Sequence, residues 1–587
     1  MRLTPFYIYS RILDVMNTSN ATNNKKKGLL FQAGILAIAG MISRVIGLLY
    51  GSPLAAIIGD EGNGYYATAS EIYAIVLLIS SYSIPSAMSK IISQKLAVKD
   101  YTNAHRIFKG ALVYVTVVGA IAGLFLFFRA GLLAVGRSAT VLKFYAPTIF
   151  LFGYLGVLRG YFQAHRTMVP TSISQLIEQI FNAIMSISAA LVLTNIAGNE
   201  DPSKRAVYGA IGSTIGTSSG VVIALLFMLN VYWINRKRIK KRIELDDHKS
   251  QPGSEIFRMI ILIVTPFILS TFIYNLSTSL NATLFSRILL HVKHLDEAEI
   301  ASMYGIFNRK AMTITKLPIA LASAAAAAMI PEISALFAQG DKEGANRTVS
   351  RVTKVILMIA IPCAAGLFFL AKPIIMILFP QRVSMDQAAM LLRILSVTVV
   401  FYSLSTVSNA VLQGIGKVNV PVINAFFALI VQSVALVLLL VFTDIPNVAL
   451  CIVTIIYSFL MCMLNSMSLK KHITTVTNYK KVYVLPIASA VIMGGMAYLT
   501  YFLASSGVYL VGYLTKSSLV TSGMDVFDFM YTNYFVNLGC SIVAVLAGVF
   551  VYFAVLIRSG GATENEIKRL PKGATIASIL KKLHILR

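Results

Sequence analysis

The chain has 587 residues, of which 57% are hydrophobic and only 13% are charged. A soluble domain carries about 25% charged residues, so this composition excludes a soluble protein and indicates a polytopic membrane protein. The apolar segments are about 20–30 residues long, which suits membrane-spanning helices and excludes the strands of about 9–11 residues in membrane β-barrels. The net charge of +27 is divided into short clusters between these segments, so nucleic-acid binding, which requires one basic soluble face, is not expected.

Fourteen apolar segments predict an all-α polytopic membrane protein with about 14 transmembrane helices. We expect two six-helix lobes related by pseudo-symmetry, followed by two C-terminal helices. The predicted regions are a cytoplasmic N-terminal tail at 1–27, an N-lobe at 28–234, a basic cytoplasmic linker at 235–255, a C-lobe at 256–468, the last two helices with their connecting loop at 469–558, and a basic cytoplasmic C-tail at 559–587.

Basic residues between the apolar segments predict the orientation. Alternate loops, together with both tails, contain 34 of the 51 Lys and Arg residues. Loops of membrane proteins that face the cytoplasm are enriched in Lys and Arg, so both termini are predicted to be cytoplasmic. The opposite loops, at 59–62, 199–204 and 295–299, are expected to face outside.

Two sequence echoes predict that the lobes are repeats of one another. Six identical residues recur at an offset of 241 between 92–106 and 333–347, and Gln and Pro of 163–170 recur in 413–421. Both loops of each pair lie on the same predicted side of the membrane. The halves are therefore expected to be parallel repeats about an axis along the membrane normal.

An arginine in the middle of the first apolar segment is the first candidate functional residue. Arg44 is the one charged residue in 28–59. A cation at mid-depth costs about 2.5–3.5 kcal/mol on insertion scales, and Arg44 is too far from either end of the segment to reach the headgroups. We expect it to face a wet or anion-occupied interior; the alternative is a structural pairing with a carbonyl or carboxylate.

Cations also outnumber carboxylates elsewhere at membrane depth. Arg159 and Lys316 are predicted, with Arg44, to bind an anionic headgroup, because a guanidinium presents a forked donor set that suits phosphate or pyrophosphate. A cation pathway would instead need rings or relays of carboxylates. Glu71 and Glu178 are the two carboxylates at this depth, and they are candidates for ion coupling or for salt bridges.

The remaining charged residues near the segments are interpreted as structural. Several are expected to extend to headgroups at span ends (Lys90, Arg287, Arg309 and Arg393), and three acidic residues are interpreted as ordinary loop residues (Asp60, Glu61 and Asp100). The sequence has no P-loop, no zinc-protease motif and no clustered Cys and His ligands. Neither enzymatic activity nor a cofactor or metal is therefore expected.

Four stretches resemble a known family: SRVIG (43–47), GDEGNGYY (59–66), IPSAMSKIIS (84–93) and RGYFQAHRTMVPTSISQLIEQ (159–179). Over about residues 28–560 the chain resembles the SpoVB and YtgP group of polysaccharide biosynthesis transporters of Gram-positive bacteria. This group belongs to the multidrug/oligosaccharidyl-lipid/polysaccharide (MOP) exporter superfamily and is related to the MurJ lipid II flippases. SRVIG is shared with the latter, whose arginine corresponds to Arg44.

The resemblance implies a flippase that moves an undecaprenyl-pyrophosphate-linked cell-wall precursor, with lipid II favoured, outward across the bacterial plasma membrane by alternating access. Its implied partners are this lipid-linked precursor, membrane lipids and cell-wall synthesis enzymes. The chain departs from its relatives at Tyr50 and Gly51, where a second arginine is common, and at Met312 and Thr313, which replace an Asp-Arg pair of Gram-negative flippases. The cavity is therefore not expected to be arranged as in MurJ.

Three other functions stay open at this point. The first is a flippase for another polysaccharide lipid, and the second is a cation-coupled multidrug exporter that would use Glu178 for its ion. The third is a non-transporting membrane scaffold for wall synthesis, for which charges inside the spans would be dispensable.

Overall fold

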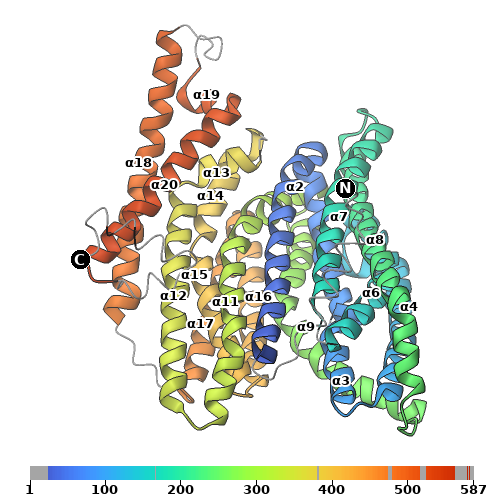
Figure 1. Ribbon diagram of the computed structural model, residues 1–587. Coiled ribbons are helices and arrows are strands. Elements are labelled where there is room, and N and C mark those ends of the chain that lie inside the picture. The colour runs from blue at the N-terminus through green and yellow to red at the C-terminus, as the bar shows by residue number, and fades with distance from the viewer. Residues whose placement is uncertain are drawn as a thin grey trace, which may run out of the picture.

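The computed structural model describes residues 24–82, 84–165, 167–379, 382–473, 479–515 and 524–561, together with residues 578 and 581. In this part of the chain the secondary structure is helical, without strands (Figure 1). The expectations for 1–23 and for most of the C-tail lie outside the described residues.

The first half of the chain runs from α2 to α8. Its elements are α2 (Asn24–Leu77), the π-helical η1 (Leu78–Tyr82), α3 (Ile84–Ala97), α4 (Tyr101–Leu133), α5 (Gly136–Lys143), α6 (Ala146–Ala164), α7 (Val169–Ala197) and α8 (Pro202–Glu244).

The second half runs from α9 to α17. Its elements are α9 (Gly253–His291), α10 (Glu297–Gly305), the π-helical η2 (Ile306–Met312), α11 (Thr313–Ala338), α12 (Lys342–Phe369), α13 (Ala371–Leu378), the 3₁₀-helical η3 (Arg382–Ser384), α14 (Met385–Leu395), α15 (Thr398–Gly414), α16 (Asn419–Phe442) and α17 (Pro446–Lys470). The C-terminal elements are the π-helical η4 (Lys480–Val484), α18 (Leu485–Leu514), α19 (Val526–Thr532) and α20 (Tyr534–Arg558).

The described residues contain nine helices that are long and apolar enough to cross a membrane, or up to eleven if two bent helix pairs each count as one span. α2 joins two predicted spans across a kink at Gly59, whose φ of 69° is left-handed and suits glycine. The polytopic helical fold is therefore confirmed, whereas the number fourteen and the domain boundaries stay predictions.

The turn before α4 and the turn before α12 share one geometry, as the echo at an offset of 241 predicts. Asp100 caps α4 with φ −79° and ψ 76°, and Asp341 caps α12 with φ −78° and ψ 79°. Each side chain accepts a hydrogen bond from the backbone N–H three residues later, which satisfies an otherwise free donor of the first helical turn. The residues before them, Lys99 and Gly340, both have positive φ. The sequence similarity between 92–106 and 333–347 thus corresponds to a repeated helix–turn–helix unit.

Small residues bring the helices of the first half close together. A Cβ atom at Gly212 or Gly216 of α8 would overlap Ala190 or Ser186 of α7. Such small-residue contacts are typical of helix pairs in membranes, where close packing replaces the hydrophobic driving force. In Figure 1, α2 lies between the other helices of the first half and the second half, and α18 and α20 form an outer pair beside α12.

Candidate functional site

The two halves meet at the end of the molecule that is predicted to face outside. A Cβ atom at Gly64 of α2 would overlap the carbonyl oxygen of Ala301 in α10, and one at Gly305 would overlap the carbonyl oxygen of Asp60. Because neither glycine has a side chain, the two backbones can approach more closely than other residues would allow. At this end the structure therefore leaves no passage between α2 and α10.

A buried ion pair, which we call the outer latch, joins the halves at the same end. The latch consists of Asp60 of α2, Lys310 of η2 and Ser384 of η3. Lys310 is 1% exposed and its Nζ lies 2.5 Å from Asp60 Oδ1. Lys310 also donates to Ser384 Oγ, which in turn donates to Asp60 Oδ2. The interpretation of Asp60 as an ordinary loop residue is wrong.

Arg309 and Lys310 are adjacent in the π-helical segment η2 and contact different partners. Short π-helical segments within α-helices are frequent at functional sites. Whereas Lys310 enters the outer latch, Arg309 lies with its Cζ 4.9 Å from the ring centre of Tyr66. One of its guanidinium nitrogens lies 3.9 Å from where a Cβ atom of Gly51 would be. Arg309 thus contacts α2 between the halves, and the expectation that it extends to headgroups is wrong.

Glu71 connects the halves at a greater depth. Its Oε1 accepts a hydrogen bond from Asn308 Nδ2 at 3.1 Å and lies 3.7 Å from Lys316 Nζ. Glu71 follows Asp60 by eleven residues, which corresponds to about 16 Å along a helix and thus to the middle of a bilayer about 30 Å thick. The structure therefore places Glu71 in a salt bridge, one of the two roles predicted for it. The Lys316 side chain remains 47% exposed.

Arg44 lies on a face of α2 that borders open space. Gly40, Gly47 and Gly51 are at positions i−4, i+3 and i+7 from Arg44, so all four residues share one helical face. A Cβ atom at Gly40 or Gly47 would have no neighbour within 4 Å, and Gly51 faces Arg309. The Arg44 side chain is exposed, and no described residue forms an ion pair or a hydrogen bond with it.

The apolar surface of the same helix points elsewhere. Ile38, Ile42, Val45 and Leu49 are exposed and follow one another at helical spacing, which forms a stripe suited to acyl chains. At 100° per residue, Arg44 lies about 130° from the centre of that stripe. We name Arg44, Arg309 and Lys316 the central cations, because each lies on or against the α2 surface between the halves.

Arg159 and Glu178 form a pair inside the first half. Arg159 is 6% exposed; its Nε donates to Ser174 Oγ at 2.8 Å, and its Nη2 donates to Glu178 Oε2 at 2.7 Å. The structure thus gives Glu178 the salt-bridge role. It does not bring Arg159 together with the central cations, because its guanidinium is neutralised and buried between α6 and α7.

An apolar cavity of about 380 Å³ lies between the second half and the C-terminal helices. Its lining includes Pro318 of α11, Pro362 of α12, Met493 of α18 and Val549 of α20. Pro318 is two residues from Lys316 on α11, so their side chains point to opposite sides of the helix, Lys316 towards Glu71 of α2 and Pro318 towards the cavity.

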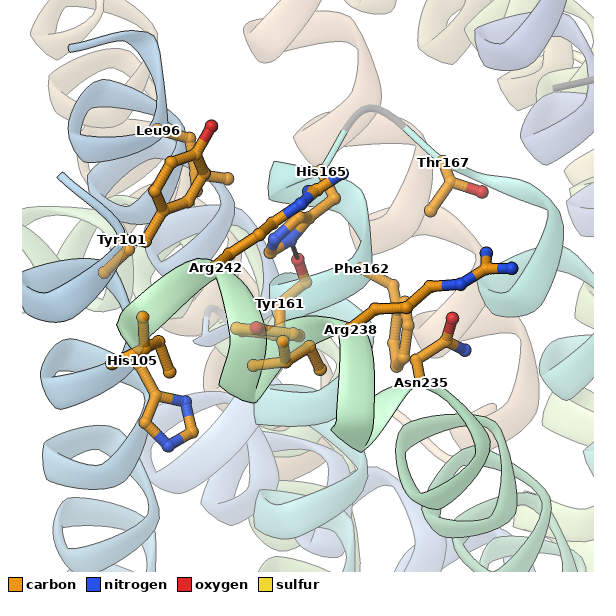
Figure 2. Close-up of a pocket in the computed structure, with 13 residues that line it drawn as sticks. Leu96, Tyr101, His105, Tyr161, Phe162, His165, Thr167, Asn235, Arg238 and Arg242 are labelled. Carbon is orange, nitrogen blue, oxygen red and sulfur yellow. Dashed lines mark hydrogen bonds between the residues drawn. The ribbon is translucent and has the colours of Figure 1, made fainter. Parts of the chain in front are cut away.

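A second cavity lies in the first half, at the end predicted to face the cytoplasm (Figure 2). It has a volume of about 230 Å³ and lies between α4, α6 and the basic end of α8. Arg238 and Arg242 line it together with His105 and His165. These residues are distinct from the central cations.

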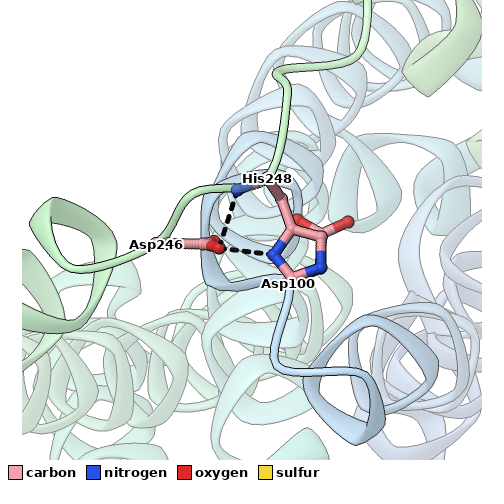
Figure 3. Close-up of side chains that lie close together, drawn as sticks. All are labelled: Asp100, Asp246 and His248. Carbon is pink, nitrogen blue, oxygen red and sulfur yellow. Dashed lines mark hydrogen bonds and ion pairs between the residues drawn. The ribbon is translucent and has the colours of Figure 1, made fainter.

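Residues 246–251 of the predicted linker form hydrogen bonds with the start of α4, beside this cavity. Figure 3 shows Asp246 and His248 of the linker next to Asp100, which caps α4. Asp246 accepts a hydrogen bond from the Thr102 backbone at 2.6 Å and from His248 Nδ1 at 2.6 Å. Asn103 donates to the Lys249 carbonyl and accepts from the Gln251 backbone. Ligand atoms of Asp246, His248 and the capping Asp100 lie within 4.8 Å of one another, a spacing that a metal ion could bridge. Both carboxylate oxygens of Asp246 already accept hydrogen bonds, so the contact does not require a metal ion.

This linker contact is expected to depend on pH. The hydrogen bond to Asp246, with the charges of Asp100 and Asp247, raises the pKa of His248. Burial alone would raise the pKa of Asp246, but hydrogen bonds from Thr102 and His248 outweigh it and lower the pKa. The contact should therefore be strongest between about pH 4 and 6.5, the ordinary values for Asp and His. It should weaken as the pH rises through the raised pKa of His248 and as it falls through the lowered pKa of Asp246.

Hydrogen exchange of residues 245–252, corrected for intrinsic exchange rates, measures this dependence. His248→Gln should remove the transition that follows the raised pKa of His248 and retain the acidic one. Protection that is independent of pH in the wild-type protein would contradict the assignment.

The fold is that of transporters of the MOP superfamily. The structure of a lipid II flippase MurJ in an inward closed conformation matches with a TM-score of 0.60 at 16% identity, covering 89% of this chain and 97% of that one. An inward-facing multidrug resistance MATE family transporter of the MOP superfamily gives a TM-score of 0.57 at 18% identity, covering 75% of this chain and 98% of that one. At such identities the matches establish the fold alone.

Residues 29–337 match the family of polysaccharide biosynthesis proteins, and residues 287–439 match the MatE family. Because the first match covers more than half of the chain, the protein belongs to the polysaccharide biosynthesis protein family. Stage V sporulation protein B of Bacillus subtilis (strain 168) is 24% identical over 83% of this chain and 92% of its own length. Lipid II flippase MurJ of the same organism is 23% identical over 68% of this chain and 75% of its own length. The resemblance stated from the sequence is thereby confirmed.

Proposed function

We propose that this protein is a flippase that moves an undecaprenyl-pyrophosphate-linked cell-wall precursor outward across the bacterial plasma membrane, with both termini in the cytoplasm. The observation that carries the proposal is Arg44, a cation on the open glycine face of α2 that has no partner among the described residues. Arg309 and Lys316 supply further positive charge along the same helix. Membrane lipids are its second class of partner, and cell-wall synthesis enzymes would act on its substrate on either side.

The central cations bind the pyrophosphate while the polyprenyl tail stays in an apolar environment. The exposed apolar stripe of Ile38, Ile42, Val45 and Leu49 offers such an environment on the helix that carries Arg44. Alternating access then requires the outer latch to open and the opposite end to close. An inside-negative potential favours outward movement of a net negative headgroup by about 2.3 kcal/mol per charge per 100 mV.

Lipid II is the favoured member of this substrate class, by analogy with the MurJ relatives. The other reading, a cation-coupled exporter, needs a carboxylate that is free to bind an ion. Glu178 is held 2.7 Å from Arg159, and Glu71 is paired with Lys316, so neither carboxylate is free in this conformation.

Transport into the outer leaflet of reconstituted vesicles tests the proposal. Vesicles containing lipid II, an undecaprenyl-monophosphate sugar or phosphatidylglycerol are compared by the access of an impermeant reagent to each headgroup. We expect the protein to accelerate movement of the pyrophosphate lipid at least tenfold more than that of the other two, and more at an inside-negative potential. Equal acceleration of all three lipids, or none, would overturn the substrate class.

A further inference from the structure

The cavity at the cytoplasmic end of the first half carries unpaired positive charge. Arg238 and Arg242 both project into it from α8 (Figure 2). Within the described part of the chain no carboxylate pairs with either of them; Arg242 instead lies over the ring of Tyr101 at 5.9 Å. Two guanidinium groups facing one cavity without a carboxylate are suited to an anion that is not part of the chain.

Buried polar atoms in the same cavity lack partners. Thr167 is 8% exposed, and its Oγ1 has no hydrogen-bond partner among the described residues. The same holds for Nδ1 of His105. A buried hydroxyl without a partner costs about 1–3 kcal/mol, and in native structures such a group usually marks a site for water, an ion or a ligand.

His165 adds a group that can become a donor. Its Nδ1 donates to the Tyr161 carbonyl at 2.9 Å, so the proton sits on Nδ1 and Nε2 is left as an acceptor. Burial, together with the charge of Arg242, lowers the pKa of His165 and so disfavours a third positive charge in the cavity. An anion that enters would favour proton uptake on Nε2.

The cavity lies where α8 leaves the apolar region. Trp233 is 61% exposed and carries the Arg236 guanidinium on its ring at 4.8 Å. Tryptophan and arginine in this combination are typical of the membrane–water boundary. Asn235, which lines the cavity, belongs to the same helical turn. The cavity is thus accessible both to lipid headgroups and to solutes in the cytoplasm.

We propose that this cavity is a binding site for a phosphate group, carried either by an anionic membrane lipid or by a small phosphorylated solute. Arg238 and Arg242 bind the phosphate oxygens, while Thr167 and the imidazole of His165 complete the hydrogen bonds. A volume of about 230 Å³ accommodates the phosphate with a small polar group such as glycerol, but no long chain. The site is separate from the central cations and does not depend on the proposed transport function.

Trp233 is the single tryptophan of the chain and lies within one helical turn of Asn235 and Arg236, so its fluorescence reports on this site. The full-length protein in phosphatidylcholine nanodiscs is titrated with glycerol 3-phosphate, and in parallel it is reconstituted with increasing fractions of phosphatidylglycerol. Saturation by glycerol 3-phosphate identifies a soluble ligand, and saturation by phosphatidylglycerol alone identifies a lipid headgroup. Either supports the site; no saturation by either probe overturns it.

The matched control uses the neighbouring lysines. Arg238→Gln with Arg242→Gln should weaken binding at least tenfold, and Thr167→Val severalfold. Lys237→Gln with Lys241→Gln removes the same charge from the same helix but changes no lining residue, and should alter affinity less than twofold. Equal losses in both double variants would show general electrostatic attraction and overturn the proposal. Arg44→Gln should bind as the wild type does, which separates this test from that of transport.

Discussion

Replacing Arg44 with glutamine is expected to abolish growth of a strain that depends on this protein for flipping its wall precursor, without lowering its amount in the membrane. A hydrogen bond to a charged group contributes about 1.5–3 kcal/mol, so loss of one should lower the affinity for the pyrophosphate lipid by about 10- to 150-fold. Arg44→Lys keeps the charge but not the forked donors, and should retain part of the activity.

Arg129 provides the matched control. It is also an exposed arginine of a spanning helix, α4, without a partner among the described residues. Arg129→Gln should keep at least half of the wild-type transport rate in vesicles. If Arg44→Gln transports lipid II within threefold of the wild-type rate, the assignment of Arg44 to the headgroup is wrong.

Removing one partner of the outer latch should open the end that is predicted to face outside. Breaking a buried ion pair by removing one member costs about 3–5 kcal/mol, because the other charge stays buried without compensation. Lys310→Met is therefore expected to shift the population away from the closed state, and Asp60→Asn should do the same. The double variant leaves no buried charge and should return most of the way towards wild type.

Labelling of a cysteine at position 301 with an impermeant maleimide measures this shift, in a background that lacks the four natural cysteines. Ala301 is 6% exposed beside Gly64, so the rate should rise at least tenfold when the halves separate. The control is Lys293→Met, which breaks an ion pair to the exposed Asp444, a type of pair that contributes about 0–1 kcal/mol. Labelling of Lys310→Met at the wild-type rate would show that the pair does not hold this end closed.

The two arginines predicted from the sequence show why the site could be predicted only in part. Arg44 and Arg159 look alike in the sequence, since each is a cation within an apolar segment. Their surroundings in the structure differ. Arg159 forms an ion pair with Glu178 on the adjacent helix, whereas Arg44 shares its helical face with glycines. Lys316 was predicted as a cation that is open to substrate, and it is exposed although weakly paired.

The residues that the sequence did not reveal depend on contacts between distant segments. Asp60 and Ser384 are 324 positions apart, and their contact exists only because the two halves pack against each other. The π-helical insertion η2, which sends Arg309 and Lys310 to different partners, has no distinct pattern in the sequence. An arginine followed by a lysine within a span was the one available signal.

What the sequence by itself determined about this protein is the helical membrane fold, the repeat of the two halves and the family. These are local properties, since the length of an apolar segment, a capping aspartate or a short motif depends on neighbouring residues only. The tertiary structure alone decided which buried charges neutralise one another and which remain free for a ligand. The physical reason is that the cost of a charge in the membrane depends on its partners within a few ångströms, and helix packing, not sequence order, chooses those partners.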